Sequence, residues 1–399
     1  MKLAILTCGM LPIPAVQGGA VENLIDFYLE YNDIHKLHDI TVYSPWNPEV
    51  IKHPALNSKV NRYIYIDTTS IKARIGRNIY KIFHSSGDYY NYFIEYYFEK
   101  VYSNLRKKNY DYIILENGAG LAYKLTLRGY KNLILHMHND IRPSKAKYHQ
   151  IIFKNISKIL TVSDYIKERV SSLLPTDRIK TVYNGIDLKR FTPKEVATIN
   201  RQQLGFEDDD FIMVFSGRIN KEKGISELIE AMLQFEHYPK IKLMILGGSF
   251  FNNVKNDDTF TISLKNKAKA IERKIAFTGF IPYHQVPDYL QLANIAVLPS
   301  MWEEPFGLTI VETMAVGLPL ITTRSGGIPE ICEGVATIVE RDNIVNNLAT
   351  AILDLYQHPE KRKQMAAASI ERAKLFDKEA YAKNFFNAID GIQTKAEYP

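Results

Sequence analysis

The sequence predicts an α/β protein with two doubly wound parallel sheets, and three observations support this prediction. Apolar runs of strand length alternate with segments of helical periodicity along the chain, which is the pattern of parallel α/β sheets. The chain has 399 residues, 46% of them hydrophobic, which is enough for two or three domains with cores of their own. A turn segment, Asn-Gly-Ile-Asp at 184–187 followed by Pro193, separates two series of strands.

The apolar runs assign five strands to each sheet. The first series is expected at 2–7, 39–43, 112–115, 133–136 and 158–161, and the second at 211–215, 242–246, 275–277, 295–298 and 320–322. The clearest helix follows Gly18-Gly19, because Val21, Leu24, Ile25, Tyr28 and Leu29 keep the spacing of one buried helical face. We therefore expect an N-terminal domain over 1–190, a C-terminal domain over 191–377, and an amphipathic C-terminal helix within 378–399 that packs back on the first domain.

Composition excludes several classes of protein. No apolar run approaches the length of a membrane-spanning helix, and the first nine residues are too short for a signal peptide. The two cysteines, Cys8 and Cys332, lie in apolar settings and lack metal-ligand spacing, which fits a reducing compartment. The expected location is the cytoplasm.

The formal charge of +6 is unevenly distributed. Residues 1–190 carry 27 basic and 17 acidic side chains, whereas residues 191–399 carry 23 and 27. The segment 71–108 is the most basic part, with eight basic and three acidic residues among ten aromatic ones. It fits a long helix with buried aromatic residues and solvated charges, a membrane-surface contact, or a nucleic-acid contact.

Two carboxylates, Glu304 and Glu312, are the first and last residues of the segment Glu-Pro-Phe-Gly-Leu-Thr-Ile-Val-Glu, which follows a predicted buried strand. Gly307 is expected to open a helix, whose free amides at Gly307, Leu308 and Thr309 would bind an anion. Ligands of doubly wound sheets bind at this strand end. A phosphate held there leaves the carboxylates to bind hydroxyls on either side, which suits a nucleotide sugar. The spacing alone also fits a helix-capping Glu and a surface Glu.

Other candidate residues follow neighbouring strands of the second series. Arg218 and Lys223 emerge after 211–215 and could neutralise a diphosphate, although a basic loop is often just solvated. Phe280 follows a strand and could lie beside a base, with the backbone at Gly279 on the base edge. Asp208–Asp210 precedes a strand among polar residues and is interpreted as a solvated turn.

In the first series, Gly18-Gly19 at a helix start allows close approach of a ligand to the backbone, without the full Gly-x-Gly-x-x-Gly pattern. His136, His138 and Asp140 follow an apolar strand and are similar to the His-x-His-x-Asp of binuclear metallohydrolases, but Ile141 stands where a further His is expected. The histidines could hold a metal, include one functional His, or form a buried structural pair.

Together these motifs resemble the large retaining glycosyltransferase family 4, of the two-domain B-type fold. The resemblance rests on Gly-Arg-x5-Gly at 217–224 with Lys223, the Glu-x7-Glu pair, Gly18-Gly19, Asn-Gly-Ile-Asp at 184–187 and Ser-Gly-Gly-Ile-Pro-Glu at 325–330. It covers nearly the whole chain. It implies two Rossmann-like domains facing a cleft, with the donor nucleotide sugar held by the C-terminal domain and the acceptor largely by the N-terminal one.

The resemblance also implies residue roles. The expected catalytic residues are Glu304, His138, Arg218 and Lys223, with His138 preferred to His136 because it lies farther along the strand. The expected donor-binding residues are Gly19 and the Gly307, Leu308 and Thr309 amides on the phosphates, Glu312 on the ribose and Phe280 on the base. The segment 71–108 matches no family pattern.

The implied reaction is sugar transfer with retention of anomeric configuration and without a metal or other cofactor. A UDP-sugar is favoured as donor, then a GDP-sugar, and the acceptor is a saccharide or a lipid-linked saccharide, as in bacterial cell-surface polysaccharide assembly. The charge of the first half favours peripheral contact with an anionic membrane at its cytoplasmic face, and no nucleic-acid partner is expected. Two alternatives remain: a metal-dependent hydrolase built on His136, His138 and Asp140, and a non-catalytic or epimerising nucleotide-sugar-binding protein of the same fold.

Overall fold

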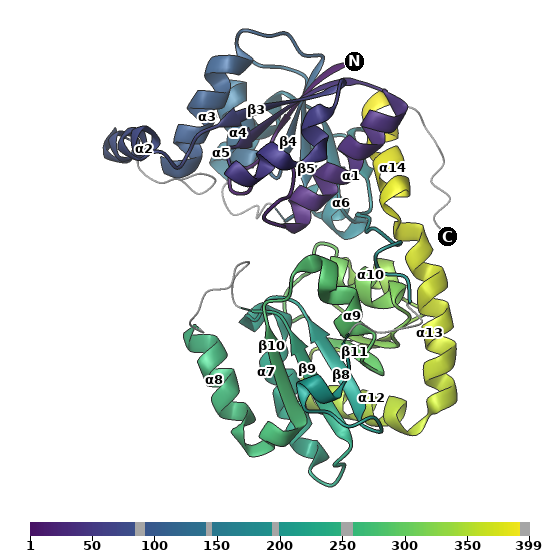
Figure 1. Ribbon diagram of the computed structural model, residues 1–399. Coiled ribbons are helices and arrows are strands. Elements are labelled where there is room, and N and C mark those ends of the chain that lie inside the picture. The colour runs from purple at the N-terminus through teal and green to yellow at the C-terminus, as the bar shows by residue number, and fades with distance from the viewer. Residues whose placement is uncertain (84–91, 141–145, 194–198, 249–257, 392–399) are drawn as a thin grey trace. The chain divides into compact units, whose positions relative to one another are not determined.

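The computed structural model describes residues 1–83, 92–140, 146–193, 199–248 and 258–391. The chain divides into two compact units, one comprising Met1–Gly185 with Lys378–Pro399 and the other Ile186–Asp377. Each unit is built on one parallel sheet flanked by helices (Figure 1), which confirms the predicted α/β class with two sheets.

The sheet of the first unit has seven parallel strands in the order β3-β2-β1-β4-β5-β6-β7. Its strands are β1 (Lys2–Leu6), β2 (Asp39–Pro45), β3 (Asn61–Ile66), β4 (Tyr112–Glu116), β5 (Leu133–Met137), β6 (Ile156–Thr161) and β7 (Ile179–Thr181). Its helices are α1 (Ala20–His35), α2 (Ile71–Phe83), α3 (Tyr92–Leu105), α4 (Ala119–Leu127), α5 (Ala146–Lys154), α6 (Asp164–Val170) and α14 (Lys378–Asp390).

The sheet of the second unit has six parallel strands in the order β10-β9-β8-β11-β12-β13. Its strands are β8 (Phe211–Ser216), β9 (Ile241–Leu246), β10 (Ile275–Gly279), β11 (Ile295–Leu298), β12 (Leu320–Thr323) and β13 (Thr337–Val339). Its helices are α7 (Ile225–Met232), α8 (Thr259–Ala268), α9 (Val286–Leu290), α10 (Leu308–Ala315), α11 (Ile328–Cys332), α12 (Ile344–Gln357) and α13 (Pro359–Ala373).

The strand order places a topological switch point in each sheet. The first strand of each unit lies inside its sheet, β1 between β2 and β4, and β8 between β9 and β11. The chain therefore runs outward in opposite directions from β1/β4 and from β8/β11. Ligands of such sheets bind beyond the carboxyl ends of the strands at this point.

The strands predicted from apolar runs are present, but β3, β7 and β13 were not predicted. All three lie at a sheet edge. An edge strand is covered on fewer sides, so its sequence lacks the continuous apolar run of a central parallel strand. In β13 all three residues are only half-buried, and in β7 only Ile179 is buried. The apolar signal is therefore weak in these three strands, although it did identify the edge strand β10.

Helix α14 belongs to the first unit and packs on α1. The Phe385 ring stacks on Tyr28 with ring centroids 4.1 Å apart, and both side chains are fully buried. At the end of α14, the Lys158 Nζ donates to the carbonyls of Ala388 at 3.0 Å and Ile389 at 2.6 Å. A lysine at this position satisfies terminal helix carbonyls and complements the helix dipole.

The interpretation of 71–108 as one long helix is wrong. The structure has two helices here, α2 and α3, and residues 84–91 between them lie outside the described part. Tyr97 and Phe98 of α3 are buried, as expected for core aromatic residues, whereas α2 exposes its isoleucines. Within the described ranges, no helix is both long and apolar enough to cross a bilayer.

Replacing Phe385 should destabilise the first unit. We expect Phe385→Ala to lower the free energy of unfolding by about 3–5 kcal/mol, because it leaves a cavity against Tyr28. Lys383→Ala, at an exposed position of the same helix, should change it by less than about 0.5 kcal/mol. Hydrogen–deuterium exchange resolves the units: α1 and α14 should exchange faster in Phe385→Ala, while β8 is unchanged. Equal effects of the two substitutions would contradict the packing role.

Candidate functional site

The loops after β8 and β11 meet at the switch point of the second sheet. Gly224 has a positive φ of 67°, and a Cβ there would lie 1.8 Å from the Pro299 carbonyl oxygen. Only glycine therefore allows this approach. The Met301 amide donates to the Glu222 carbonyl at 2.8 Å, which fixes the two loops to one another.

This contact brings together two residues predicted from separate motifs. The Lys223 Nζ donates to the Glu304 Oε2 at 2.5 Å, and the Trp302 Nε1 donates to the same oxygen at 2.9 Å. The Lys223 and Glu304 side chains are 21% and 13% exposed, so the ion pair is partly shielded but reachable. The backbone amide of Lys223 donates to the Asn220 side chain at 3.2 Å, which fixes the turn from which the lysine extends.

The Ser-Gly-Gly-Ile-Pro-Glu motif holds the Glu304 loop from the other side. The Gly327 amide donates to the Glu304 carbonyl at 2.8 Å. A Cβ on Gly326 would lie 2.2 Å from the same carbonyl oxygen, at a φ of 54°. Gly326 therefore lets the backbone lie directly against the Glu304 loop, and the Gly327 amide holds it there.

The amino end of α10 lies beside the ion pair. Gly307 precedes the helix with a φ of 104° and supplies no side-chain cap. The first amides of a helix have no partner within it, and the dipole makes this end positive. A cavity of about 20 Å³, the size of one water molecule, is lined by Ser216, Lys223, Ser300, Glu304, Gly307 and Thr309 among others. The arrangement offers a cation, a carboxylate and helix amides to one ligand.

Glu312 lies farther along α10 and is buried. The Tyr283 hydroxyl donates to its Oε1 at 2.9 Å, and the Arg190 guanidinium lies 5.1 Å from the centroid of the Tyr283 ring. Burial raises the pKa of Glu312 to about 7, against the opposing effects of the Tyr283 hydrogen bond and the Arg190 charge. A pKa near 7 means that Glu312 changes charge near neutral pH.

Arg218 and Phe280 lie at other strand ends of the same sheet. Arg218 is exposed and follows β8 directly, so it belongs to the switch point. Phe280 is 37% exposed and follows β10 at the sheet edge, two strands away from β8. The structure therefore joins Lys223, Glu304, Gly307 and Thr309 in one cavity, while Arg218, Phe280 and Glu312 do not line it.

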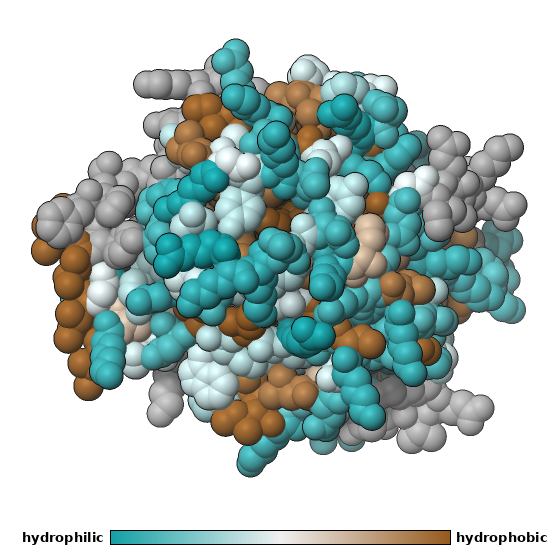
Figure 2. Space-filling view, turned by 90° about the horizontal axis from the view of Figure 1, so that it is seen from above, coloured by the Kyte–Doolittle hydropathy of each residue, from teal (hydrophilic) through white to brown (hydrophobic). Residues whose placement is uncertain are grey.

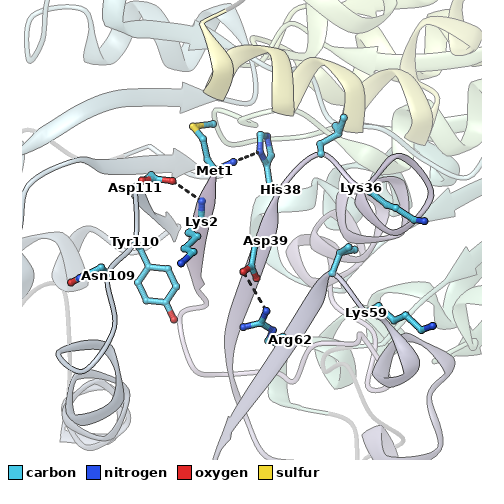
Figure 3. A pocket seen from close by; sticks show the side chains of 12 residues that line it. Met1, Lys2, Lys36, His38, Asp39, Lys59, Arg62, Asn109, Tyr110 and Asp111 are labelled. Atoms are coloured by element: carbon cyan, nitrogen blue, oxygen red, sulfur yellow. Dashed lines mark hydrogen bonds and ion pairs between the residues drawn. The ribbon is translucent and has the colours of Figure 1, made fainter.

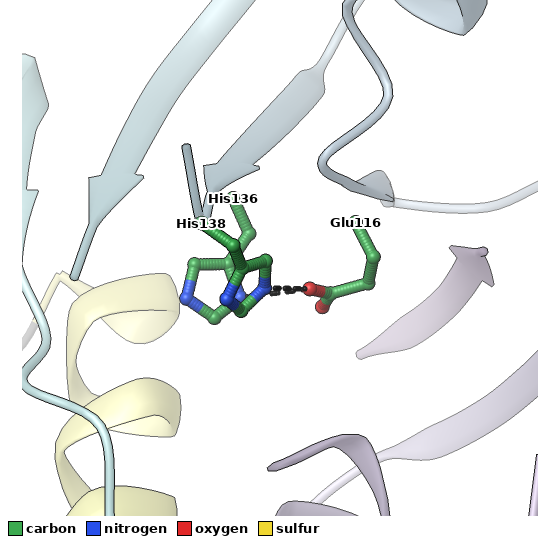
Figure 4. Close-up of side chains that lie close together, drawn as sticks. All are labelled: Glu116, His136 and His138. Atoms are coloured by element: carbon green, nitrogen blue, oxygen red, sulfur yellow. Dashed lines mark hydrogen bonds and ion pairs between the residues drawn. The ribbon is translucent and has the colours of Figure 1, made fainter. Parts of the chain in front are cut away.

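In the first unit, Glu116 at the end of β4 faces both histidines of the neighbouring strand (Figure 4). Its Oε2 lies 3.0 Å from the His136 Nδ1 and 2.8 Å from the His138 Nε2. The Tyr28 hydroxyl donates to the Oε1 at 2.9 Å. All of these groups are buried, so this carboxylate is held entirely by neighbouring side chains.

The cluster shifts the pKa of two of its members, Glu116 and His138. Burial by itself would raise the pKa of Glu116, but His136 and His138 together hold that pKa well below its usual range. Burial and the charge of His136 lower the pKa of His138, against the opposing effect of Glu116. A neutral His138 that donates from Nε2 keeps Nδ1 as an acceptor. Among the described residues, this Nδ1 has no hydrogen-bond partner.

The same groups could also serve as metal ligands, since their ligand atoms lie within 4.8 Å of one another. The ligand set differs from the one proposed for a metallohydrolase. The Oδ2 of Asp140 lies 2.6 Å from the Arg169 Nε, so this carboxylate is engaged in an ion pair, and Asp140 does not belong to the cluster. Glu116 takes the place that the sequence pattern gave to Asp140.

Gly19 lies where the sequence placed it, immediately before α1, with a φ of 107°. A Cβ there would lie 2.1 Å from the Glu22 Oε2, so the glycine accommodates a carboxyl group. Burial raises the pKa of Glu22 and favours its neutral form. A ligand that approaches Gly19 would meet this carboxyl group.

A larger cavity of about 760 Å³ opens at the amino ends of β1 and β2 (Figure 3). Two of its polar contacts join residues of the lining: Arg62 pairs with Asp39 at 3.3 Å, and the Lys2 amide donates to the Asp111 Oδ2 at 2.7 Å. Ligands of doubly wound sheets bind at the opposite ends of the strands. We therefore do not assign the candidate site to this cavity.

Sequence reasoning missed four contributors: Glu116, Tyr283, Trp302 and Arg190. Glu116 ends the apolar run of β4, a position at a strand carboxyl end that could have marked it. Trp302 lies two residues before Glu304 and Tyr283 three after Phe280. Arg190 lies in the segment between the predicted domains, where sequence offers no sign that it faces Tyr283.

Comparisons with known proteins match this chain to glycosyltransferases. The model of the family described as Glycosyl transferases group 1 matches residues 196–372, and that of Glycosyltransferase Family 4 matches residues 32–190. The chain is similar to the putative glycosyltransferase YtcC of Bacillus subtilis, with 29% identity over 88% of this chain and 82% of that protein. It is also 26% identical to the lipopolysaccharide 1,2-N-acetylglucosaminetransferase of Salmonella typhimurium, over 69% of this chain and 73% of the relative.

Solved structures show the same architecture. The structure of Anabaena Alr3699/HepE in complex with UDP and glucose matches with a TM-score of 0.74 and 18% identity, over 98% of this chain and 100% of that one. The two family models together account for most of both units. The chain therefore belongs to the group 1 and family 4 glycosyltransferases, with the two-domain B-type glycosyltransferase fold.

Proposed function

We propose that the protein transfers a sugar from a nucleoside diphosphate sugar to a saccharide or lipid-linked saccharide, with retention of anomeric configuration and without a metal ion. A UDP-sugar is the favoured donor and a GDP-sugar the next. The likeness to HepE, which was solved with UDP and glucose, supports the first choice. We assign the donor to the second unit and the acceptor largely to the first.

The observation that carries this proposal is the Lys223–Glu304 ion pair beside the amino end of α10. A bound diphosphate would compete with Glu304 for Lys223, since the phosphate carries more negative charge. Glu304 would then be released to accept hydrogen bonds from hydroxyls of the donor sugar. One ligand with an anionic and a hydroxyl-rich part fits this pair better than either part alone.

The proposed chemistry develops negative charge on the departing nucleoside diphosphate. The acceptor oxygen forms a bond to the anomeric carbon on the same face from which the diphosphate oxygen leaves, and the acceptor proton passes to a departing phosphate oxygen. Lys223, Arg218 and the amides of Leu308 and Thr309 would stabilise that charge. Preorganised donors of this kind supply what a divalent ion supplies elsewhere, each typically about 3 kcal/mol of the barrier.

Further roles complete the proposal. Glu312 would accept hydrogen bonds from the ribose hydroxyls, and Phe280 would lie against the base. In the first unit, the His138 Nδ1 is a buried acceptor suited to a sugar hydroxyl, with Glu116 as the group that orients the ring. Gly19 is assigned to the phosphates.

We also propose that the enzyme works at the cytoplasmic face of a membrane, in cell-surface polysaccharide assembly. The relative from Salmonella typhimurium is named for lipopolysaccharide, which supports a lipid-linked acceptor. The first half of the chain is basic, which favours peripheral contact with anionic lipids.

The central test separates Lys223 from Glu304. Lys223→Ala should weaken UDP binding at least tenfold in calorimetry, because it removes a cation from the diphosphate. Glu304→Gln should leave UDP affinity equal or improved, because Lys223 is released, but should lower the turnover of sugar transfer at least a hundredfold.

Two neighbouring residues serve as matched controls. Lys221 lies in the same turn as Lys223 and is exposed, and Glu303 precedes Glu304 and pairs with Arg341. Lys221→Ala and Glu303→Gln should retain both UDP affinity and turnover. UDP affinity that is equal in Lys223→Ala and Lys221→Ala would remove the ion pair from the donor site.

Donor affinity should depend on pH through Glu312. Its pKa of about 7 in the free protein means that lowering the pH from 8 to 6 protonates the carboxylate and removes an acceptor for the ribose hydroxyls. UDP affinity should therefore fall about five- to tenfold over this range. The phosphate of the ligand also titrates near pH 6, so the Glu312→Gln variant provides the baseline.

The Tyr283→Phe variant gives a second test of whether Glu312 sets the pH dependence. The Tyr283 hydrogen bond favours the ionised carboxylate, so its loss should move the midpoint of the wild-type pH profile upward. Superimposable profiles of wild type and Glu312→Gln would show that Glu312 does not contact the ligand.

Sugar transfer should persist in the presence of a chelator. The cationic side chains and the helix amides are proposed to neutralise the diphosphate, and Glu116 already faces both histidines. Activity after exhaustive treatment with EDTA should stay within twofold of the untreated enzyme. Loss of activity that a defined divalent ion restores would refute the metal-free mechanism, and elemental analysis of Glu116→Gln would show whether the histidine cluster holds that ion.

A further inference from the structure

Helix α2 of the first unit has an unusual distribution of side chains. Its four isoleucines, at positions 71, 75, 79 and 82, are 77%, 56%, 50% and 78% exposed. With 3.6 residues per turn they fall within an arc of roughly 80° on one face of the helix. Figure 2 shows hydrophobic residues in a column at its left edge, on the side where α2 lies in Figure 1.

The part of α2 that contacts α3 includes two small residues, although Arg77, which is half-buried, also lies on the side away from the isoleucines. Ala73 is buried, and a Cβ on Gly76 would lie 2.6 Å from the Tyr96 ring of α3. The small residues thus allow α2 to lie close to the domain, while the large aliphatic ones point outward. A surface helix of a globular protein normally shows the reverse pattern, with its apolar stripe toward the core. Packing against the residues of the first unit that the structure describes therefore does not account for the isoleucines.

The charges of α2 are all of one sign. The helix contains Lys72, Arg74, Arg77 and Lys81 and no acidic residue. Lys72 lies on one side of the isoleucine arc, and Arg74 and Lys81 lie on the other, all three exposed. An outward apolar stripe between rows of basic residues is the arrangement of a helix that lies in the plane of a membrane interface.

We infer that α2 docks the first unit on an anionic lipid surface, with the isoleucine face in the headgroup–acyl boundary and the basic residues among the headgroups. The positive charge of the whole helix decides between this partner and a second copy of the chain, since two such helices would repel each other. The inference rests on the proposed function only for its purpose, which is to bring the protein to a lipid-linked acceptor. It also changes the nature of the contact, because apolar insertion and not charge alone would hold the protein.

Vesicle binding by the full-length protein tests this inference. Wild type should cosediment with vesicles of equal parts phosphatidylglycerol and phosphatidylcholine, and much less with phosphatidylcholine alone. The double variant Ile75→Ser/Ile79→Ser should bind the anionic vesicles at least tenfold more weakly. Because both positions are exposed, the fold should be retained, which circular dichroism and UDP binding would verify.

Control variants distinguish the isoleucines of α2 from other exposed isoleucines, and the apolar contact from the basic charges. Ile34 and Ile51 are 74% and 61% exposed elsewhere on the first unit, and Ile34→Ser/Ile51→Ser should bind as wild type. Lys72→Gln/Lys81→Gln should bind more weakly at low salt and depend less on salt.

Three results would overturn the inference. The first is failure of wild type to bind anionic vesicles, and the second is equal binding by Ile75→Ser/Ile79→Ser. The third is lipid-free self-association in analytical ultracentrifugation that this variant abolishes, which would identify a second copy as the partner. Sugar transfer to a soluble acceptor, measured in parallel, should be unchanged in the variant. Vesicle binding without any transfer would refute the proposed function and leave the docking surface intact.

Discussion

The close approach of Gly224 to the Pro299 carbonyl is the constraint on which the site of the second unit depends. It presses the loop after β8 against the loop after β11, and the Met301–Glu222 hydrogen bond fixes the contact. A side chain at position 224 would separate the loops and with them Lys223 and Glu304. From the other side, Gly326 makes a similarly close approach to the Glu304 carbonyl, and the Gly327 amide donates to that carbonyl. The glycines therefore act through the backbone, while Lys223 and Glu304 are the side chains that we propose to act on the ligand.

In the first unit, the side chains around Glu116 keep a buried carboxylate ionised. Glu116 is stable there because Tyr28 and the two histidines occupy both of its oxygens. Tyr28 is in turn covered by Phe385 of α14, so the C-terminal helix contributes to the surroundings of the cluster. A buried charge that is this fully partnered fixes the orientation of His138 and the atom that it presents.

The cavities of the two units differ in the groups that line them. At the amino ends of β1 and β2, in the first unit, a large cavity contains the Arg62–Asp39 ion pair and the hydrogen bond from the Lys2 amide to Asp111. At the carboxyl ends of β8 and β11, in the second unit, the amino end of α10, Lys223 and Glu304 surround a space about the size of one water molecule. The chemistry of the lining, and not the volume, identifies the second as the candidate site. The outward isoleucines of α2 add a third kind of surface, apolar and positively charged, on the unit to which the acceptor is assigned.

The sequence by itself determined the fold class, the central strands of both sheets and the family, because continuous apolar runs and closely spaced glycine and charge motifs are local signals. It also predicted Lys223 and Glu304 as site residues, from two separate motifs. Only the tertiary structure decided that these two residues form an ion pair and that Tyr283 donates to Glu312 with Arg190 over its ring. It also decided that Glu116 and not Asp140 joins the histidines. It likewise decided that 71–108 is not one helix and that α2 turns its isoleucines outward. Helical periodicity shows which residues share a face, but the direction of that face depends on the partner against which the helix packs.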